Sequence, residues 1–154
     1  MTDRYVCGQR KIPEQMPVRP LRSKRALVVD DDSSVARVIK QLLEREHYSV
    51  TLRTSVGSGI AAIKMGLIPD LAVIDVLFPN ASGREYPGGV DVYRALRERS
   101  HNTPVVFMTG AYDEERFADV DDAITTNCAV LVQKPLIQLG LHRAIRNAYA
   151  KAGK

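Results

Sequence analysis

Short runs of apolar residues alternate along the chain with segments in which apolar residues recur at helical spacing. Each run is too short for a helix, and most are rich in the β-branched residues that favour strands. We therefore expect five strands, at residues 26–29, 48–53, 71–74, 105–108 and 129–132.

A helix is expected after each strand. Ser33 and Ser34 offer an N-cap for the first one, in which apolar residues recur at helical spacing from Val35 through Val38 to Leu43. Further helices are expected at 55–65, 90–99, 113–125 and 136–150, the last of them with Leu136, Leu139, Ile145 and Tyr149 facing inward. Five strand-then-helix units in succession predict an α/β fold, a doubly wound parallel sheet with helices on both faces.

The composition is that of an ordinary globular domain, with 45% apolar and 26% charged residues. No apolar stretch approaches the ~18 residues of a membrane span, and the first residues lack the apolar core of a secretory signal. Cys7 and Cys128 lie far apart without a metal-binding spacing. We therefore expect a cytoplasmic protein with no membrane contact.

The net charge of +4 is unevenly distributed. The first 25 residues carry +5, and the remaining residues sum to −1. Residues 1–24 also contain three prolines and show no periodicity, so we expect a flexible basic arm there and a folded domain over 25–154. Because the basic character belongs to this arm, nucleic acid is not expected as a partner.

Polar residues that end the apolar runs are the candidates for chemistry. They are Asp30, Asp31 and Asp32 after the first run, Asp75 after the third, Thr109 after the fourth and Lys134 after the fifth. The carboxyl ends of parallel strands meet at one edge of a sheet. Two carboxylates ~4 Å apart repel by about 4 kcal/mol at an effective dielectric near 20, so such a cluster requires cations. Lys134 supplies one positive charge, and Mg²⁺, which binds carboxylate oxygens, is suited to supply the remaining positive charge.

Four segments together resemble the receiver domains of two-component response regulators, particularly the single-domain chemotaxis regulators. They are VVDDDSSVARVI, DLAVIDVLFP, VVFMTG and VLVQKP, in the order and spacing of that family. The resemblance implies a flavodoxin-like sheet with strand order 2-1-3-4-5. It also implies a stand-alone phosphoacceptor, not an enzyme acting on other molecules, which signals through protein contacts.

The resemblance also assigns roles to individual residues. Asp75 would accept the phosphoryl group, Thr109 would hydrogen-bond it, and Lys134 would pair with it. Mg²⁺ would be bound by Asp31, Asp75 and the backbone carbonyl of Leu77, with Asp30 holding its waters. Pro135 would follow Lys134 in a cis peptide, and Asp32 is a helix cap or a surface acid.

Expected partners are a histidine kinase or histidine phosphotransfer protein and an unknown downstream protein. A homodimer through the face formed by the last two helices and the last strand is possible in this family. Three features depart from the family pattern: a longer loop over residues 80–89, apolar Leu77 and Ala111 beside the path of the hydrolytic water, and Leu131 in place of an aromatic switch residue.

Two other functions are compatible with parts of the sequence. The segment from Leu27 to Asp32 also resembles the opening motif of haloacid-dehalogenase-like phosphatases, with Asp30 as nucleophile, but residues 135–154 contain no acid for the metal site that this family requires. A receiver fold that works as a binding module without phosphate is the other alternative. Binding of a beryllofluoride phosphoryl mimic would distinguish them.

Overall fold

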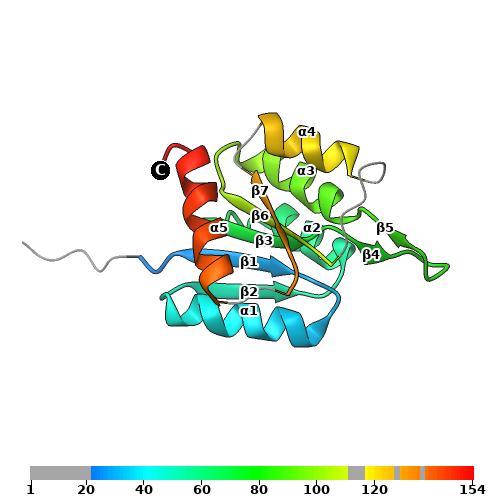
Figure 1. Cartoon of the computed structure of the whole chain (residues 1–154), viewed down its shortest axis with the longest axis horizontal. Coiled ribbons are helices and arrows are strands. Elements are labelled where there is room, and N and C mark those ends of the chain that lie inside the picture. Colours follow the sequence, from blue (N-terminus) through cyan, green and yellow to red (C-terminus); the bar gives the residue numbers. More distant parts are fainter. Residues whose placement is uncertain (1–21, 111–116, 127–128, 136–137) are drawn as a thin grey trace, which may run out of the picture.

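The computed structural model describes residues 22–110, 117–126, 129–135 and 138–154, and its centre is a five-stranded parallel sheet (Figure 1). The order across the sheet is β2-β1-β3-β6-β7. The strands are β1 (Arg25–Val29), β2 (Ser49–Arg53), β3 (Leu71–Asp75), β6 (Val105–Thr109) and β7 (Ala129–Gln133). Counted among the parallel strands alone, this is the order 2-1-3-4-5, so the predicted doubly wound fold is confirmed.

Helices cover both faces of the sheet. The helices are α1 (Ser33–Arg45), α2 (Val56–Lys64), α3 (Gly89–Arg99), α4 (Ala118–Thr126) and α5 (Gln138–Lys151). Because side chains alternate along a strand, Leu27 and Val29 pack into one core with α2, α3 and α4, whereas Ala26 and Val28 pack into a second core with α1 and α5. The sheet is therefore buried on both sides, which explains the continuous apolar runs.

Two apolar side chains that the helical pattern placed inward lie at the surface. Leu139 is 67% exposed, so its predicted burial is wrong, and Val38 on α1 is 52% exposed. The buried positions of α5 are Leu141, Ala144 and Ala148. Successive helical residues are turned by about 100°, so Leu139 faces roughly opposite to Leu141. Ile145 and Tyr149 flank the buried stripe and are partly buried, and Leu136 lies outside the described residues.

Helix boundaries differ from the prediction at two places. Asp32 caps α1, one of the two roles expected for it, whereas the N-cap expected at Ser33 or Ser34 is wrong: Asp32 Oδ1 accepts hydrogen bonds from the backbone N–H groups of Ser34 (2.9 Å) and Val35 (3.2 Å). Helix α4 was expected from residue 113, but residue 117 is not helical and α4 begins at Ala118. The backbone carbonyl of Phe117 accepts a hydrogen bond from the backbone N–H of Asp121. The side chain of Phe117 is also buried, and together these contacts fix the start of the helix.

The longer loop after β3 contains a small antiparallel hairpin, β4 (Phe78–Pro79) and β5 (Glu85–Tyr86). Its turn is organised by Asn80, whose Oδ1 accepts from Ser82 N, Ser82 Oγ and Arg84 N at 2.7–3.0 Å. Gly83 completes the turn with φ 79°, a conformation that favours glycine. In Figure 1 the hairpin extends from the sheet edge toward which the strands point.

Within the described residues, no helix combines the length and apolar character that crossing a lipid bilayer requires.

Candidate functional site

Three charged residues from separate strands meet at the carboxyl edge of the sheet. Asp30 follows β1, Asp75 ends β3 and Lys134 follows β7. The ammonium Nζ of Lys134 donates hydrogen bonds to Asp30 Oδ2 and to Asp75 Oδ2, both at 2.8 Å. Asp30 is 0% exposed and Asp75 only 6%. The lysine thus bridges two buried carboxylates that are 45 positions apart in the chain.

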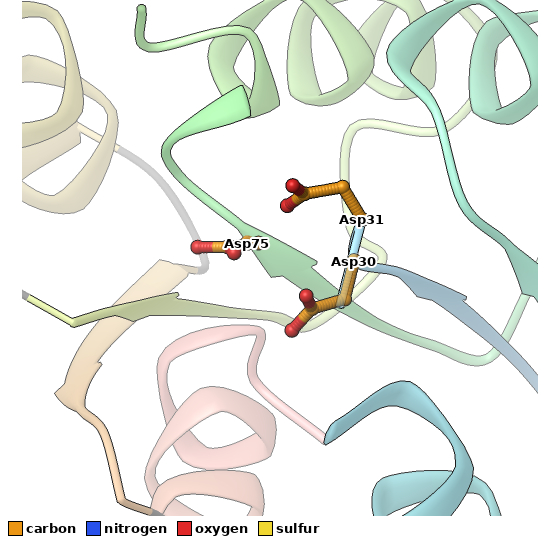
Figure 2. Close-up of side chains that lie close together, drawn as sticks. All are labelled: Asp30, Asp31 and Asp75. Carbon is orange, nitrogen blue, oxygen red and sulfur yellow. The ribbon is translucent and has the colours of Figure 1, made fainter. Parts of the chain in front are cut away.

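Asp31 joins the two buried carboxylates from the exposed side. Figure 2 shows Asp30 and Asp31 beside each other after β1, with Asp75 across from them at the end of β3. One carboxylate oxygen from each of the three residues lies within 4.8 Å of the other two. The predicted cluster of acids is therefore brought together by the fold.

Backbone contacts hold these side chains in position. Asp30 Oδ1 accepts from the backbone N–H of Asp32 at 2.9 Å, which orients the carboxylate, and Asp30 N–H donates to Arg53 O at 3.1 Å. On the other side, Lys134 N–H donates to Thr109 O at 2.7 Å. The Lys134–Pro135 peptide bond is cis, as the resemblance implied.

Burial dominates the electrostatics of the candidate phosphoacceptor. The pKa of Asp75 is raised from 3.8 to about 6, mainly because burial desolvates the carboxylate, and neighbouring Asp30 contributes to the increase. Lys134 and a hydrogen bond from the backbone of Leu77 oppose this increase. Burial alone would lower the pKa of Lys134, but its hydrogen bonds to Asp30 and Asp75 outweigh that effect and raise it. The lysine is therefore held in its charged form.

The three carboxylates have the chemistry of a site for a hard divalent cation. Once ionised, they carry three negative charges against the single positive charge of Lys134, so the cluster lacks positive charge. Carboxylate oxygens are the ligands that Mg²⁺ prefers, and Mg²⁺ uses one or two of them while it keeps several waters. The donor set of Asp30, Asp31 and Asp75 fits this ion. A metal contact by the backbone carbonyl of Leu77 stays a prediction.

Of the remaining candidates, Thr109 lies on the same edge. Thr109 is buried at the end of β6, opposite Gln133 in the register, and hence beside Lys134. Leu131 is partly buried and pairs in register with Phe107, whose ring packs against Tyr93 with centroids 5.4 Å apart. Ala111, singled out for its effect on hydrolysis, lies outside the described residues.

One residue of the site was not identified from the sequence. A Cβ atom at Gly89, the first residue of α3, would lie 2.0 Å from the backbone oxygen of Asp75. The N–H of Gly89 donates to Val76 O at 3.0 Å. Only glycine permits this close approach of α3 to the strand end. The pair Gly88-Gly89 was the available signal, but its meaning depends on which backbone lies against it.

Comparison with known proteins agrees with this geometry. The family model described as response regulator receiver domain matches residues 26–146. The transcriptional regulatory protein DltR of Streptococcus agalactiae is 36% identical over 106 residues, which cover 66% of this chain and 44% of DltR. YkoG of Bacillus subtilis, described as an uncharacterized transcriptional regulatory protein, is 37% identical over 83 residues, covering 54% of this chain and 33% of its own. The chain thus spans less than half the length of these relatives.

Solved structures show the same fold. A CheY-like response regulator receiver domain protein from Methanospirillum hungatei aligns with a TM-score of 0.70 at 25% identity and covers 84% of this chain and 96% of its own. A response regulator receiver protein from Sinorhizobium medicae has a TM-score of 0.71 at 23% identity, covering 86% and 98%. From its sequence, fold and clustered strand-end residues, this chain belongs to the response regulator receiver domain family of two-component systems.

Proposed function

We propose that Asp75 accepts a phosphoryl group from the phosphohistidine of a histidine kinase or histidine phosphotransfer protein. The observation that carries this proposal is the position of Lys134, whose Nζ lies 2.8 Å from both Asp30 and Asp75. A lysine held there stabilises the negative charge of a phosphoryl group on Asp75. Asp75 ends its strand at the open edge of the sheet, where an incoming group can reach it.

In the transfer, a carboxylate oxygen of Asp75 forms a bond to phosphorus as the bond between phosphorus and the histidine nitrogen breaks. The electron pair of that bond leaves with the imidazole. Asp75 must be ionised to attack, which its pKa of about 6 permits at neutral pH. Thr109 would hydrogen-bond the transferred group. Asp31, Asp75 and the Leu77 carbonyl would hold Mg²⁺, with Asp30 binding its waters, and the ion would neutralise charge on the phosphoryl oxygens.

A protein phosphodonor is supported by the surface beside Lys134. A cavity of about 510 Å³ lies between α1 and the residues after β7, lined by Ser34, Val35, Val38, Ile39, Lys134 and Pro135. Val38 is one of the two apolar residues that the helical pattern placed inward but that are exposed. An apolar surface next to Lys134 suits the docking of a protein helix better than the binding of a free small molecule.

The decisive experiment is labelling with a small acyl phosphate. We expect one phosphoryl group per chain, no uptake by Asp75→Asn, and no uptake when the divalent cation is chelated. Asp91→Asn, which removes an exposed carboxylate on α3, is the matched control and should label normally. Labelling of Asp75→Asn would contradict the proposal. Failure of the unmodified chain to bind beryllofluoride with Mg²⁺ would instead favour a phosphate-independent binding module.

We further propose that output passes through protein contacts and does not depend on an aromatic switch at Leu131. Leucine lacks an amphipathic ring that turns between solvent and core. Beryllofluoride should therefore shift backbone amides mainly in residues 109–112 and 80–89. Large shifts concentrated at Leu131 and α5, with none in the hairpin, would refute this. Whether the face of α4, β7 and α5 also forms a homodimer is measured in the same samples by light scattering.

A further inference from the structure

A cavity of about 200 Å³ lies against Asp31, on the side of the acidic cluster away from Lys134. We call it the hairpin cavity, because the β4–β5 hairpin contributes part of its wall and the residues before and within the first turn of α2 contribute another. It is lined by Asp31, Thr54, Ser55, Val56, Gly57, Phe78, Pro79 and Tyr86. The longer loop after β3 thus helps to form a compartment that opens beside Asp31, a candidate metal ligand.

The hairpin is fixed in place against α2. A Cβ atom at Gly88 would lie 2.7 Å from both Tyr86 Cζ and Val56 Cγ2, so the tip of the tyrosine ring and the first turn of α2 meet at this glycine. Phe78 is buried in the core that α2 and α3 share, and Tyr86 packs against the same core. The wall of the cavity is therefore part of the folded domain.

The polar groups of the cavity differ in their availability. The Ser55 hydroxyl is occupied, because it caps α2 through Ser58 N–H (3.2 Å) and lies 2.8 Å from Ser58 Oγ. Neither the Thr54 nor the Tyr86 hydroxyl forms a hydrogen bond within the described part of the chain. Water takes up about 30 Å³ per molecule in the liquid, so the cavity has room for several waters between these hydroxyls and Asp31.

We propose that the hairpin cavity holds the outer water shell of the cation, with the Thr54 and Tyr86 hydroxyls as hydrogen-bond partners for waters on the Asp31 side. The inference rests on the proposed function, since it assigns Mg²⁺ to the acidic cluster. Mg²⁺ gives up its waters reluctantly and binds through them, whereas Ca²⁺ exchanges waters for protein oxygens more readily. Thr54 and Tyr86 are thus positioning residues that favour Mg²⁺ over Ca²⁺.

The test compares the dissociation constants of Mg²⁺ and Ca²⁺, each added alone to the intact chain and followed by amide chemical shifts. Thr54→Val and Tyr86→Phe each remove one hydroxyl with little change of shape. We expect each to weaken Mg²⁺ binding by up to about tenfold, the lower end of the losses seen when outer-shell partners of a metal are removed. Ca²⁺ binding should change by less than about twofold on the same reasoning.

Ser82→Ala is the matched control, because it removes a hydroxyl from the same hairpin at a position that does not line the cavity. It should leave both constants unchanged. Unchanged Mg²⁺ binding in both test variants, or parallel weakening of Mg²⁺ and Ca²⁺, would overturn the inference. Should one variant fail to fold, the other decides. If the unmodified chain binds no Mg²⁺ and takes up no phosphoryl group, the proposed function itself has failed.

Discussion

Polar groups at the two ends of the parallel sheet differ in how they are paired. At the amino end, polar groups are paired into structural contacts: Arg25 N–H donates to Asp70 Oδ2 at 2.7 Å, and the buried Thr103 hydroxyl donates to Pro69 O at 3.1 Å. At the carboxyl end, two buried carboxylates share one lysine, and a third carboxylate lies within 4.8 Å. The Arg25 N–H and the Thr103 hydroxyl at the amino end thus have partners within the domain, whereas the carboxyl end needs further positive charge. In the proposed function, a bound Mg²⁺ would supply that charge.

The largest loss of stability is expected at Gly89, where the start of α3 lies directly against the end of β3. Gly89→Ala places a methyl group 2.0 Å from Asp75 O, so the start of α3 must move away from β3. We expect a loss of unfolding free energy of about 4 kcal/mol or more, the range of severe core defects, together with loss of phosphoryl uptake. Urea unfolding and acyl phosphate labelling measure the two effects.

Gly57→Ala is the control for this substitution. A Cβ atom at Gly57 in α2 meets nothing within 4 Å, and alanine favours helix over glycine by about 1 kcal/mol. This variant should be as stable as the unmodified chain or more so. Equal effects at the two glycines would show that α3 is not constrained by the strand end.

The next largest effect is expected from removing the positive charge of Lys134, which bridges Asp30 and Asp75. Lys134→Met leaves Asp30, which is fully buried, without its charged partner. Breaking a buried ion pair from one side typically costs 3–5 kcal/mol, so a loss of about 3 kcal/mol is expected in urea unfolding. Mg²⁺ should restore part of it. Lys40→Met, in an exposed pair with Glu44 on α1, should cost less than about 1 kcal/mol.

The pKa of Asp75 gives a pH dependence with a definite sign. Because the folded pKa (about 6) is above the unfolded value of 3.8, the folded protein binds this proton more tightly, and stability falls as pH rises through this window. In chelator at pH 7, Asp75→Asn should therefore be more stable than the unmodified chain, by of order 1–3 kcal/mol. The gain should vanish near pH 4. An equal gain at both pH values would indicate a cause other than the charge.

A smaller effect is expected at the amino end. Thr103→Val keeps the shape of the side chain but removes its hydrogen bond to Pro69 O and its contact with the Ser100 hydroxyl, 2.8 Å away. We expect a loss of about 1–2 kcal/mol in urea unfolding. Phosphoryl uptake at Asp75 should be normal, because no group of the site is touched. Impaired uptake in this variant would show that the two ends are coupled.

The smallest effect concerns the lifetime of the phosphorylated form. Leu77 is apolar and partly buried beside Asp75, so it offers the hydrolytic water no hydrogen bond from its side chain. Leu77→Asn should quicken the decay of the phosphoprotein by several-fold, a modest acid–base or orienting contribution. The decay is measured by loss of label after the donor is removed. An unchanged or slower decay would argue against this explanation.

Sequence alone predicted the parts of the molecule that depend on strong local patterns. The buried strands follow from runs such as Leu71–Ile74, and the convergence of Asp30, Asp75 and Lys134 follows from parallel topology. Features that depend on packing against distant residues were missed. The strands of the hairpin have two residues each, too few to show periodicity. Leu139 fits a helical pattern, yet the orientation of α5 on β7 and β6 leaves it exposed.

The self-contained turn of the hairpin offers a practical handle on the site. The side chain of Asn80 holds the turn by hydrogen bonds to residues of the turn itself. Ser82 is exposed, and its hydrogen bonds within the described part of the chain go only to Asn80 Oδ1, within the turn. A fluorophore or spin label attached at this position would be carried by the β4–β5 hairpin, whose strands line a cavity together with Asp31 of the acidic cluster. Such a reporter would follow cation binding and phosphoryl transfer in real time without altering any residue of the reaction centre.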